Sequence, residues 1–313
     1  MKKLHFIVSL ITEDNDFQKQ QAIAAQEAAH GLDVDIQVLY AENDGVLQSQ
    51  QLLKAIQSNS EPRCDGIIFE AAGATDLPQV ARAAAAAGIG WGILNRQADY
   101  IQELRRNYKV PIFSVASNHA EIGHTQAHQL AALLPHGGSA LYIEGPSQQA
   151  ASKERTAGVT EAKPGNVSLR AIRGQWTEES GYRTVTSWLR LSTSQQAHFD
   201  VVAAQNDEMA MGARKAFQEI AHSASRLRWL NLPFLGCDGL PKTGQAWVNS
   251  GLLAATIISL PMAGQAVEMM TKALRTGINP PHHSLVSQES YPSVQALASS
   301  KWVKEYSVPA GAV

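Results

Sequence analysis

Polar side chains that suit small-molecule binding follow several short apolar runs of the sequence. Asn95 and Arg96 come directly after one run, Asn206 comes two residues after another, and Asp238 lies in a third such place, between Cys237 and Gly239. A guanidinium group can donate two parallel hydrogen bonds to neighbouring oxygens, and an amide both donates and accepts. Such a set is chemically suited to a ligand rich in hydroxyl groups.

Each of these residues also has an ordinary structural interpretation. Asn206 or Asp207 can cap the helix that follows, and Arg96 can be a plain surface residue of a loop. Arg155 is harder to explain this way, because it lies near the start of the helix predicted for Lys153–Glu161. A cation gains nothing from the helix dipole there, so a ligand or a carboxylate partner is indicated.

The sequence contains none of the common catalytic patterns that we considered. No glycine-rich phosphate loop ends in Lys-Ser or Lys-Thr, and no Gly-x-Ser-x-Gly elbow occurs. His124 and His128 share a predicted helix face but lack a third ligand, so neither a metal nor another cofactor is expected. Cys64 and Cys237 are expected to be buried free thiols. We therefore predict a binding protein and not an enzyme.

The amino-acid composition and the net charge limit the kinds of molecule that the protein is expected to bind. The chain has 313 residues, 44% of them apolar and 17% charged, with a net charge of −2. This length suits two domains of about 150 residues each. Lysines and arginines are scattered, without the basic patch that nucleic-acid binding needs, so nucleic acid is not an expected partner.

Short apolar runs alternate with helix-like segments along most of the chain. Strands are predicted at Leu4–Ile11, Val34–Leu39 and Gly66–Phe69, separated by helices at Phe17–His30 and Val46–Ser58. This alternation is typical of βαβ units and of a parallel sheet covered on both faces. The pattern restarts near residue 112, so the expected fold class is α/β, with two Rossmann-like, doubly wound lobes. Open sheets of this kind bind ligands at the carboxyl ends of their strands.

Four segments resemble the ribose-binding branch of the type I periplasmic binding proteins. They are LNRQA at 94–98, AQNDEMAMGA at 204–213, GCDG at 236–239 and LLAATIISLP at 252–261, and the resemblance extends over about residues 4–286. It implies two lobes joined by three crossing strands, an N-terminal lobe of 1–116 with 260–287 and a C-terminal lobe of 117–259 with 288–313. The implied function is to bind a monosaccharide in the cleft between the lobes and to deliver it to an ABC importer.

The resemblance also implies a set of ligand-binding positions in this chain. The positions that match are Ser9, Phe17, Arg96, Arg155, Trp176, Asn206 and Asp238. Four neighbouring positions depart from the family pattern. Asn95 replaces an acid, Glu70 an amide, Cys237 an aromatic residue and Ser259 a glutamine. Glu70, Asn95 and Ser259 are kept as candidate ligand residues, and a polyol or a modified sugar stays open as the ligand.

Two further questions stay open at this point. Met1-Lys2-Lys3 is followed by a short apolar run without a small-residue cleavage site, so a signal peptide is presumed removed and the periplasm is expected, with the cytoplasm as alternative. The expected partner is an ABC permease or a membrane receptor. The alternative function is the ligand-sensing input module of a signalling or regulatory system.

Overall fold

The computed structural model describes residues 2–58, 61–195, 197–220 and 223–303. Its contacts divide the chain into two compact units. The first comprises Met1–Asn118, Gln148–Ala151 and Leu260–Ser287, and the second comprises His119–Ser147, Ser152–Ser259 and Gln288–Val313. Each unit contains its own parallel sheet, which confirms the predicted α/β fold class.

The first unit is built on a six-stranded sheet in the order β11-β5-β4-β3-β1-β2, with every neighbouring pair parallel. The strands are β1 (Leu4–Leu10), β2 (Val34–Tyr40), β3 (Gly66–Glu70), β4 (Gly90–Leu94), β5 (Ile112–Ser117) and β11 (His283–Val286). The helices are α1 (Asp16–Gly31), α2 (Gly45–Gln57), α3 (Pro78–Ala86), α4 (Ile101–Asn107) and α12 (Ala263–Thr276).

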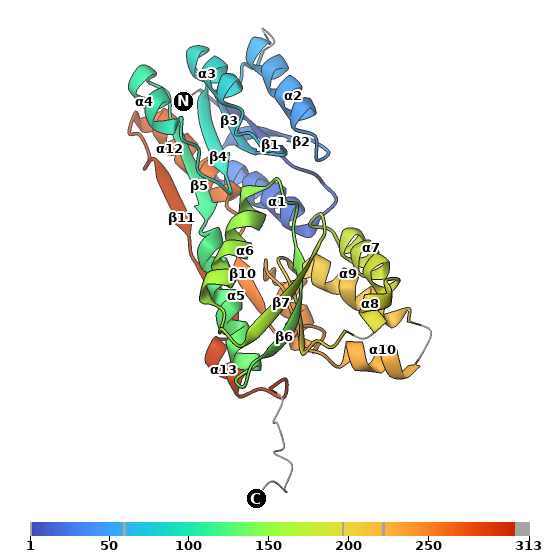
Figure 1. Ribbon diagram of the computed structural model, residues 1–313. Coiled ribbons are helices and arrows are strands. Elements are labelled where there is room, and N and C mark those ends of the chain that lie inside the picture. Colours follow the sequence, from blue (N-terminus) through green and yellow to red (C-terminus); the bar gives the residue numbers. More distant parts are fainter. Residues whose placement is uncertain (1, 59–60, 196, 221–222, 304–313) are drawn as a thin grey trace, which may run out of the picture. The chain divides into compact units, whose positions relative to one another are not determined.

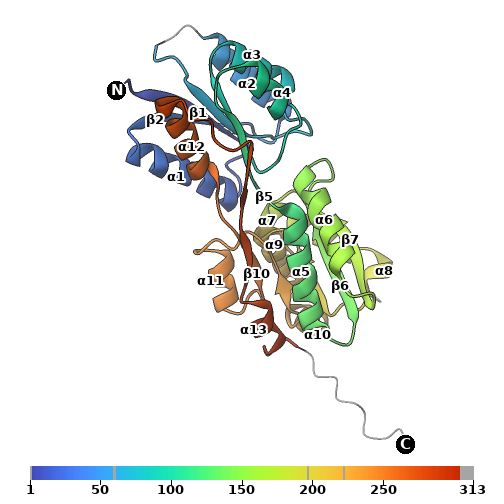
Figure 2. The ribbon, with the colours of Figure 1, turned by 90° about the vertical axis from the view of Figure 1, so that its left-hand side faces the viewer.

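Helices cover both faces of this sheet (Figure 1, Figure 2). Leu52, Val80 and Leu104 of α2, α3 and α4 pack on one face, in a cluster with the sheet residue Trp91. On the other face α1 and α12 pack against a separate cluster of sheet residues. Both faces are therefore dry, which explains why the central strands read as continuous apolar runs in the sequence.

The second unit has a four-stranded parallel sheet in the order β7-β6-β8-β9. Its strands are β6 (Gly138–Glu144), β7 (Val167–Arg173), β8 (Val201–Ala204) and β9 (Phe234–Leu235). β10 (Thr256–Ser259) and β12 (Gln288–Tyr291) form a separate antiparallel pair. The helices are α5 (His119–Leu133), α6 (Ala150–Ala162), α7 (Glu178–Leu189), α8 (Ser192–Gln195), α9 (Asp207–Gln218), α10 (Ser223–Leu230), α11 (Gly244–Asn249) and α13 (Val294–Ala298).

Several elements differ from the sequence-based expectation. The sequence predicts a helix at Met209–Ile220, whereas α9 begins at Asp207, because Asn206 provides its N-cap. The sequence also predicts a helix at Leu260–Thr276. In the structure α12 begins at Ala263, since Pro261 precedes it and the side chain of Gln21 accepts from the backbone N–H groups of Met262 and Ala263. For Tyr291–Val313 the sequence predicts a helix and an appended extension. The helix α13 lies in this segment, and residues 304–313 lie outside the described residues. None of the described helices combines the length and the apolar character needed to cross a membrane.

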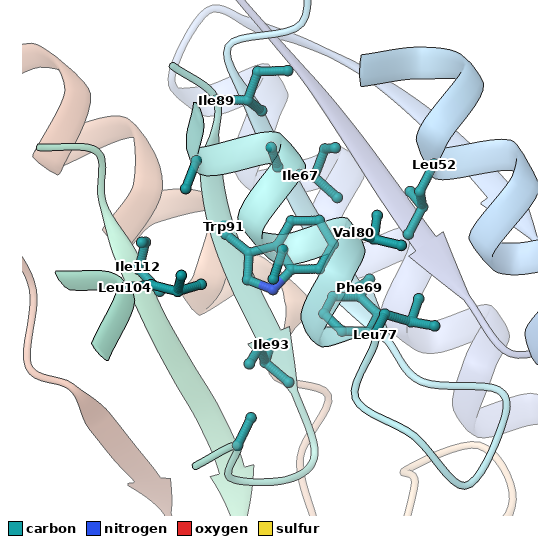
Figure 3. Packing of buried hydrophobic residues seen from close by; sticks show 14 of the residues in the cluster. Leu52, Ile67, Phe69, Leu77, Val80, Ile89, Trp91, Ile93, Leu104 and Ile112 are labelled. Carbon is teal, nitrogen blue, oxygen red and sulfur yellow. The ribbon is translucent and has the colours of Figure 1, made fainter. Parts of the chain in front are cut away.

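Trp91 is the largest fully buried side chain of the first unit. Its ring centroid lies 4.7 Å from that of Phe69, and its indole N–H donates to the hydroxyl of Tyr100 at 3.1 Å. Figure 3 shows the indole among Ile67, Phe69 and Val80, between the sheet and the helices that cover it. The side chain thus fills the centre of this face and also satisfies its one polar atom.

We predict that Trp91→Ala lowers the free energy of unfolding by about 3–5 kcal/mol, because it leaves a cavity that the surrounding core cannot fill. Urea denaturation followed by circular dichroism measures the change. Leu285→Ala in β11 is the control, because Leu285 is 54% exposed, and its effect should stay within about 0.5 kcal/mol. Equal effects of the two substitutions would contradict this placement of Trp91.

Candidate functional site

A buried carboxylate lies at the carboxyl edge of the sheet in the first unit. Glu70 is the last residue of β3 and is 4% exposed. Its Oε2 accepts from the side-chain amides of Gln18 at 2.9 Å and Gln21 at 3.4 Å, and its Oε1 accepts from the Asn95 amide at 2.9 Å. Glu70 therefore joins α1 to the loop that follows β4.

The two glutamine amides can face Glu70 in only one orientation. Oε1 of Gln18 accepts from the backbone N–H of Ile11 at 3.0 Å, and Oε1 of Gln21 accepts from the N–H groups of Met262 and Ala263 at 2.8 Å each. Because both oxygens are already turned toward backbone donors, both NH₂ groups must point at residue 70. A carboxylate, which only accepts, can receive both of these NH₂ groups and the Asn95 amide at once.

Ser9 lies inside the same network and not at the surface of its unit. Its hydroxyl is fully buried in β1 and accepts from Nε2 of Gln48 at 3.0 Å. The same nitrogen donates to the Glu70 carbonyl at 2.8 Å, and Oε1 of Gln48 accepts from the Ala72 N–H at 2.9 Å. Through Gln48, Ser9 therefore helps to hold the loop that follows β3, which is a structural role.

Arg96 is a partly accessible cation at the same edge of the sheet. Its Nη1 donates to Oδ1 of Asp76 at 2.8 Å and its Nη2 donates to the Ala71 carbonyl at 3.4 Å, with 11% of the side chain exposed. Asn95, just before it, adopts a left-handed backbone conformation with φ of 62°. Phe17 is partly buried and packs against the cluster beneath α1. Asp76 had no recognisable motif around it in the sequence.

Arg155 is the buried cation of the second unit. It is 6% exposed, its Nη1 donates to the carbonyl of Gln205, and its Nε lies 3.4 Å from Nδ1 of His119. The guanidinium carbon lies 5.5 Å from the ring centroid of Trp176. The sequence predicts a carboxylate or a ligand as the partner of Arg155. Within this unit its contacts are instead a carbonyl, an imidazole and an aromatic ring.

Asn206 positions Trp176 and caps α9. Its Oδ1 accepts from the Met209 N–H at 3.0 Å, and its Nδ2 donates to the Trp176 carbonyl at 2.8 Å. Trp176 has φ of 66°, an unfavourable conformation for a residue with a Cβ, which the bond from Asn206 helps to hold. A Cβ at Gly145 would lie 2.3 Å from the indole, so the ring packs directly on the glycine backbone.

Asp238 and Ser259 are linked through the backbone. The Asp238 N–H donates to the Ile257 carbonyl, and the Ser259 N–H donates to the Asp238 carbonyl, both at 3.0 Å. Asp238 is half-buried, whereas Ser259 is 1% exposed. Cys237 is fully buried, and burial raises the pKa of its thiol to about 12. Cys237 thus remains a neutral core residue at neutral pH.

Two residues of the second unit were missed as functional candidates although they flank Asn206. Gln205 is fully buried, and its Nε2 donates to Tyr142, Ser152 and Thr156 while its Oε1 accepts from the Gly145 N–H. Asp207 is also buried, and burial raises its pKa to about 7. Gln205 directly follows the apolar strand β8, which is the signal that could have indicated it, whereas Asp207 lies two residues further on, where the sequence favours a helix cap.

The candidate residues therefore form one group in each unit. Ser9, Glu70 and Asn95 are joined by hydrogen bonds in the first unit, and Arg155, Trp176 and Asn206 are joined by contacts in the second. The role of these residues in ligand binding stays a prediction. Among the described residues, no group of three or more His, Cys, Asp or Glu side chains is arranged to hold a metal ion.

The family model of the periplasmic binding protein domain matches residues 6–278 of the chain. The chain belongs to this family. The match covers every candidate residue and all of the strands of the two parallel sheets except β11 and the first two residues of β1, and it confirms the resemblance seen in the sequence.

Curated relatives are known by the solutes they bind. The chain is 28% identical over 221 residues to a putative rhizopine-binding protein of Rhizobium meliloti, covering 69% of this chain and 68% of the relative. It is 25% identical over 279 residues to a D-apiose import binding protein of Paraburkholderia graminis, covering 87% and 82%. A ribose import binding protein of Escherichia coli is 30% identical over 165 residues, 51% of this chain and 52% of the relative.

Solved structures share the fold. A periplasmic solute binding protein of an ABC transporter from Actinobacillus succinogenes, with bound D-allose, matches with a TM-score of 0.79 and 20% identity, covering 95% of this chain and all of the other. A solute binding protein from Bacillus halodurans with bound myo-inositol matches with a TM-score of 0.76 and 20% identity, covering 95% and 98%. At this level of identity the likeness establishes the fold alone.

We predict that Glu70→Leu lowers the free energy of unfolding by about 3 kcal/mol or more, because the buried amides of Gln18 and Gln21 and the partly buried amide of Asn95 lose their acceptor. Glu70→Gln keeps one oxygen for Gln18 and Gln21 and should cost about 1 kcal/mol. Chemical denaturation of both variants measures this order.

Glu103→Leu is the matched control, since Glu103 forms an exposed ion pair with Arg82 in the same unit. Its effect should stay below about 1 kcal/mol. If Glu70→Leu were as mild as this control, the buried amide network would not be the support that its geometry indicates.

Proposed function

We propose that this protein is a solute-binding protein that binds a monosaccharide and delivers it to an ABC importer. The observation that carries the proposal is the match to the periplasmic binding protein domain across residues 6–278, together with relatives that are named for the import of D-apiose and ribose. The periplasm is the proposed location, because the family is named for it.

The side chains at the two carboxyl edges suit a sugar chemically. Arg96, in the first unit, offers a guanidinium fork whose charge is balanced by Asp76. Asp238, in the second unit, is half-buried and offers a carboxylate acceptor, while the ring of Trp176 offers an apolar surface. A sugar presents hydroxyl groups around its rim and C–H groups on its faces, so it needs donors, acceptors and an aromatic surface together.

We propose that residues of both units recognise the ligand, and that closing on it makes the bound form recognisable to a permease. Contacts made only in the ligand-bound conformation would supply the free energy that shifts the population toward it. The proposed activity is binding without chemical change of the ligand. Import is preferred over sensing, because two of these relatives are named as import binding proteins.

We expect at least one of D-ribose, D-apiose, D-allose and myo-inositol to raise the melting temperature. At a ligand concentration about 100 times Kd, the shift should be about 5 °C or more, because a ligand that binds only the folded state stabilises it. Differential scanning fluorimetry measures the shift. Arg96→Ala in the first unit and Asp238→Ala in the second should each abolish it.

Arg82→Ala is the control, because Arg82 pairs with Glu103 in an exposed ion pair of the same unit as Arg96. This variant should keep the full ligand-induced shift. Unchanged shifts in both Arg96→Ala and Asp238→Ala would remove these residues from the site. The absence of a shift with any of a broad panel of sugars and polyols would count against the proposed ligand class.

A further inference from the structure

Asp207 has a buried carboxylate for which the proposed function has so far no role. It is the first residue of α9 and is 3% exposed. Its Oδ1 accepts from the hydroxyl of Thr256 at 2.6 Å, and its Oδ2 accepts from the N–H of Gly239 at 2.8 Å. One side chain thus joins α9 to β10 and to the loop that carries Asp238.

The loop is shaped around this carboxylate. A Cβ at Gly236 would lie 2.1 Å from Oδ1 of Asp207, and a Cβ at Gly244 would lie 2.1 Å from Oδ2. Both positions therefore need glycine to make room for the two oxygens. Gly239 itself has φ of 59°, in the left-handed region that favours glycine.

Asp238 lies between the anchoring points of Asp207. Its backbone pairs with β10 through Ile257 and Ser259, and the next residue, Gly239, donates to Asp207. Asp238 adopts φ of 112°, which is unfavourable for a residue with a Cβ and persists only where its surroundings enforce it. Thr256 is the first residue of β10, so Asp207 holds both the loop and the strand to which the loop is paired.

We propose that Asp207 is a positioning residue that fixes the carboxylate of Asp238 for the ligand. The proposal rests on the proposed function, in which Asp238 is a ligand acceptor. Asp207 does not itself touch the ligand, since its two oxygens are turned toward Thr256 and Gly239. It acts by holding the loop of residues 236–239 in a conformation that the loop would otherwise leave.

Charges around Asp207 come from several elements. Burial is the main cause that raises the pKa of Asp207 to about 7, and the charge of Glu208 raises it further. The hydrogen bonds from Thr256 and Gly239 and the charge of Arg155 on α6 lower this pKa. The thiol of Cys237, in the loop, is subject to the charges of both Asp207 and Asp238. Asp207 therefore keeps a bound proton to higher pH in the folded chain than in the unfolded chain.

Binding measurements on Asp207→Ala test the proposal. Isothermal titration calorimetry, with the sugar that stabilises the wild type best, should give a Kd at least about tenfold higher, because the loop loses both anchors. Asp207→Asn should stay within about threefold of the wild type, since its amide oxygen can still accept from Gly239. Hydrogen exchange of the Gly239 amide should be faster in Asp207→Ala than in the wild type.

Asp200→Ala is the matched control. Oδ2 of Asp200 accepts from the backbone N–H of Ser139 at 3.0 Å, which is the same kind of bond, at the start of β6 and β8 in the same unit. This control should leave Kd and the exchange of Gly239 unchanged. A wild-type Kd in Asp207→Ala overturns the proposal. If Asp207→Ala does not fold, Thr256→Val decides, because a several-fold higher Kd supports the proposal and an unchanged Kd overturns it.

The exchange measurement separates this proposal from the proposed function. If the wild type binds no sugar or polyol, the proposed function fails, while faster exchange of Gly239 in Asp207→Ala still supports the positioning of the loop. If the wild type binds a sugar and neither Kd nor exchange changes in Asp207→Ala, only the positioning role fails.

Thermal unfolding at different pH values supplies a second readout. Because the folded-state pKa of Asp207 lies above its usual value of 3.8, the wild type should lose stability relative to Asp207→Asn as the pH rises from about 4 to about 7. The melting temperature of the wild type minus that of Asp207→Asn should therefore be larger at pH 5 than at pH 8. A difference that does not change with pH contradicts the burial of this carboxylate.

Discussion

A carboxylate removed from water must find hydrogen-bond donors, and this requirement organises the carboxyl edge of both sheets. Glu70 in the first unit accepts from three side-chain amides, and Asp207 in the second accepts from a hydroxyl and a backbone N–H. Neither carboxylate lies in an ion pair of the described residues. Each instead ties two or three chain segments into one arrangement, which would lose several bonds at once if the carboxylate were removed.

The more accessible candidates depend on these buried groups. Arg96 follows Asn95, whose amide donates to Glu70, and Asp238 precedes Gly239, whose N–H donates to Asp207. Trp176 is held in the same way by Asn206, through a bond to its carbonyl. Three of these residues, Asn95, Trp176 and Asp238, have positive φ without being glycine. The strained backbone thus occurs where a buried polar side chain holds the loop, which is typical of pre-organised sites.

The sequence predicted more of the fold than of the site. Alternating apolar runs located the central strands within a few residues, because burial on both faces leaves a strong pattern. The sequence pattern did not predict β11 and β12, which are four residues long and mostly half-buried or exposed. It also did not predict α4, whose start has no side-chain cap. At the site, residue types indicated Arg96 and Asp238. The buried network that supports them could not be predicted, since contacts such as that of Gln18 with Glu70 join residues far apart in the sequence, and no local pattern marks them.

Two departures from the family pattern turn out to be one change. The resemblance implied an acid just before Arg96 and an amide after the third strand, whereas this chain has Asn95 and Glu70. In the structure these two side chains are hydrogen-bonded, with Nδ2 of Asn95 2.9 Å from Oε1 of Glu70. Exchanging an acid and an amide within a bonded pair keeps both the bond and the total charge, but it moves the negative charge onto the more buried of the two positions, where Gln18 and Gln21 are turned to receive it. An amide, which both donates and accepts, is left beside Arg96 in place of a carboxylate. The departure therefore changes which hydrogen bonds are available at this edge of the sheet, while Glu70 still accepts from Gln18, Gln21 and Asn95.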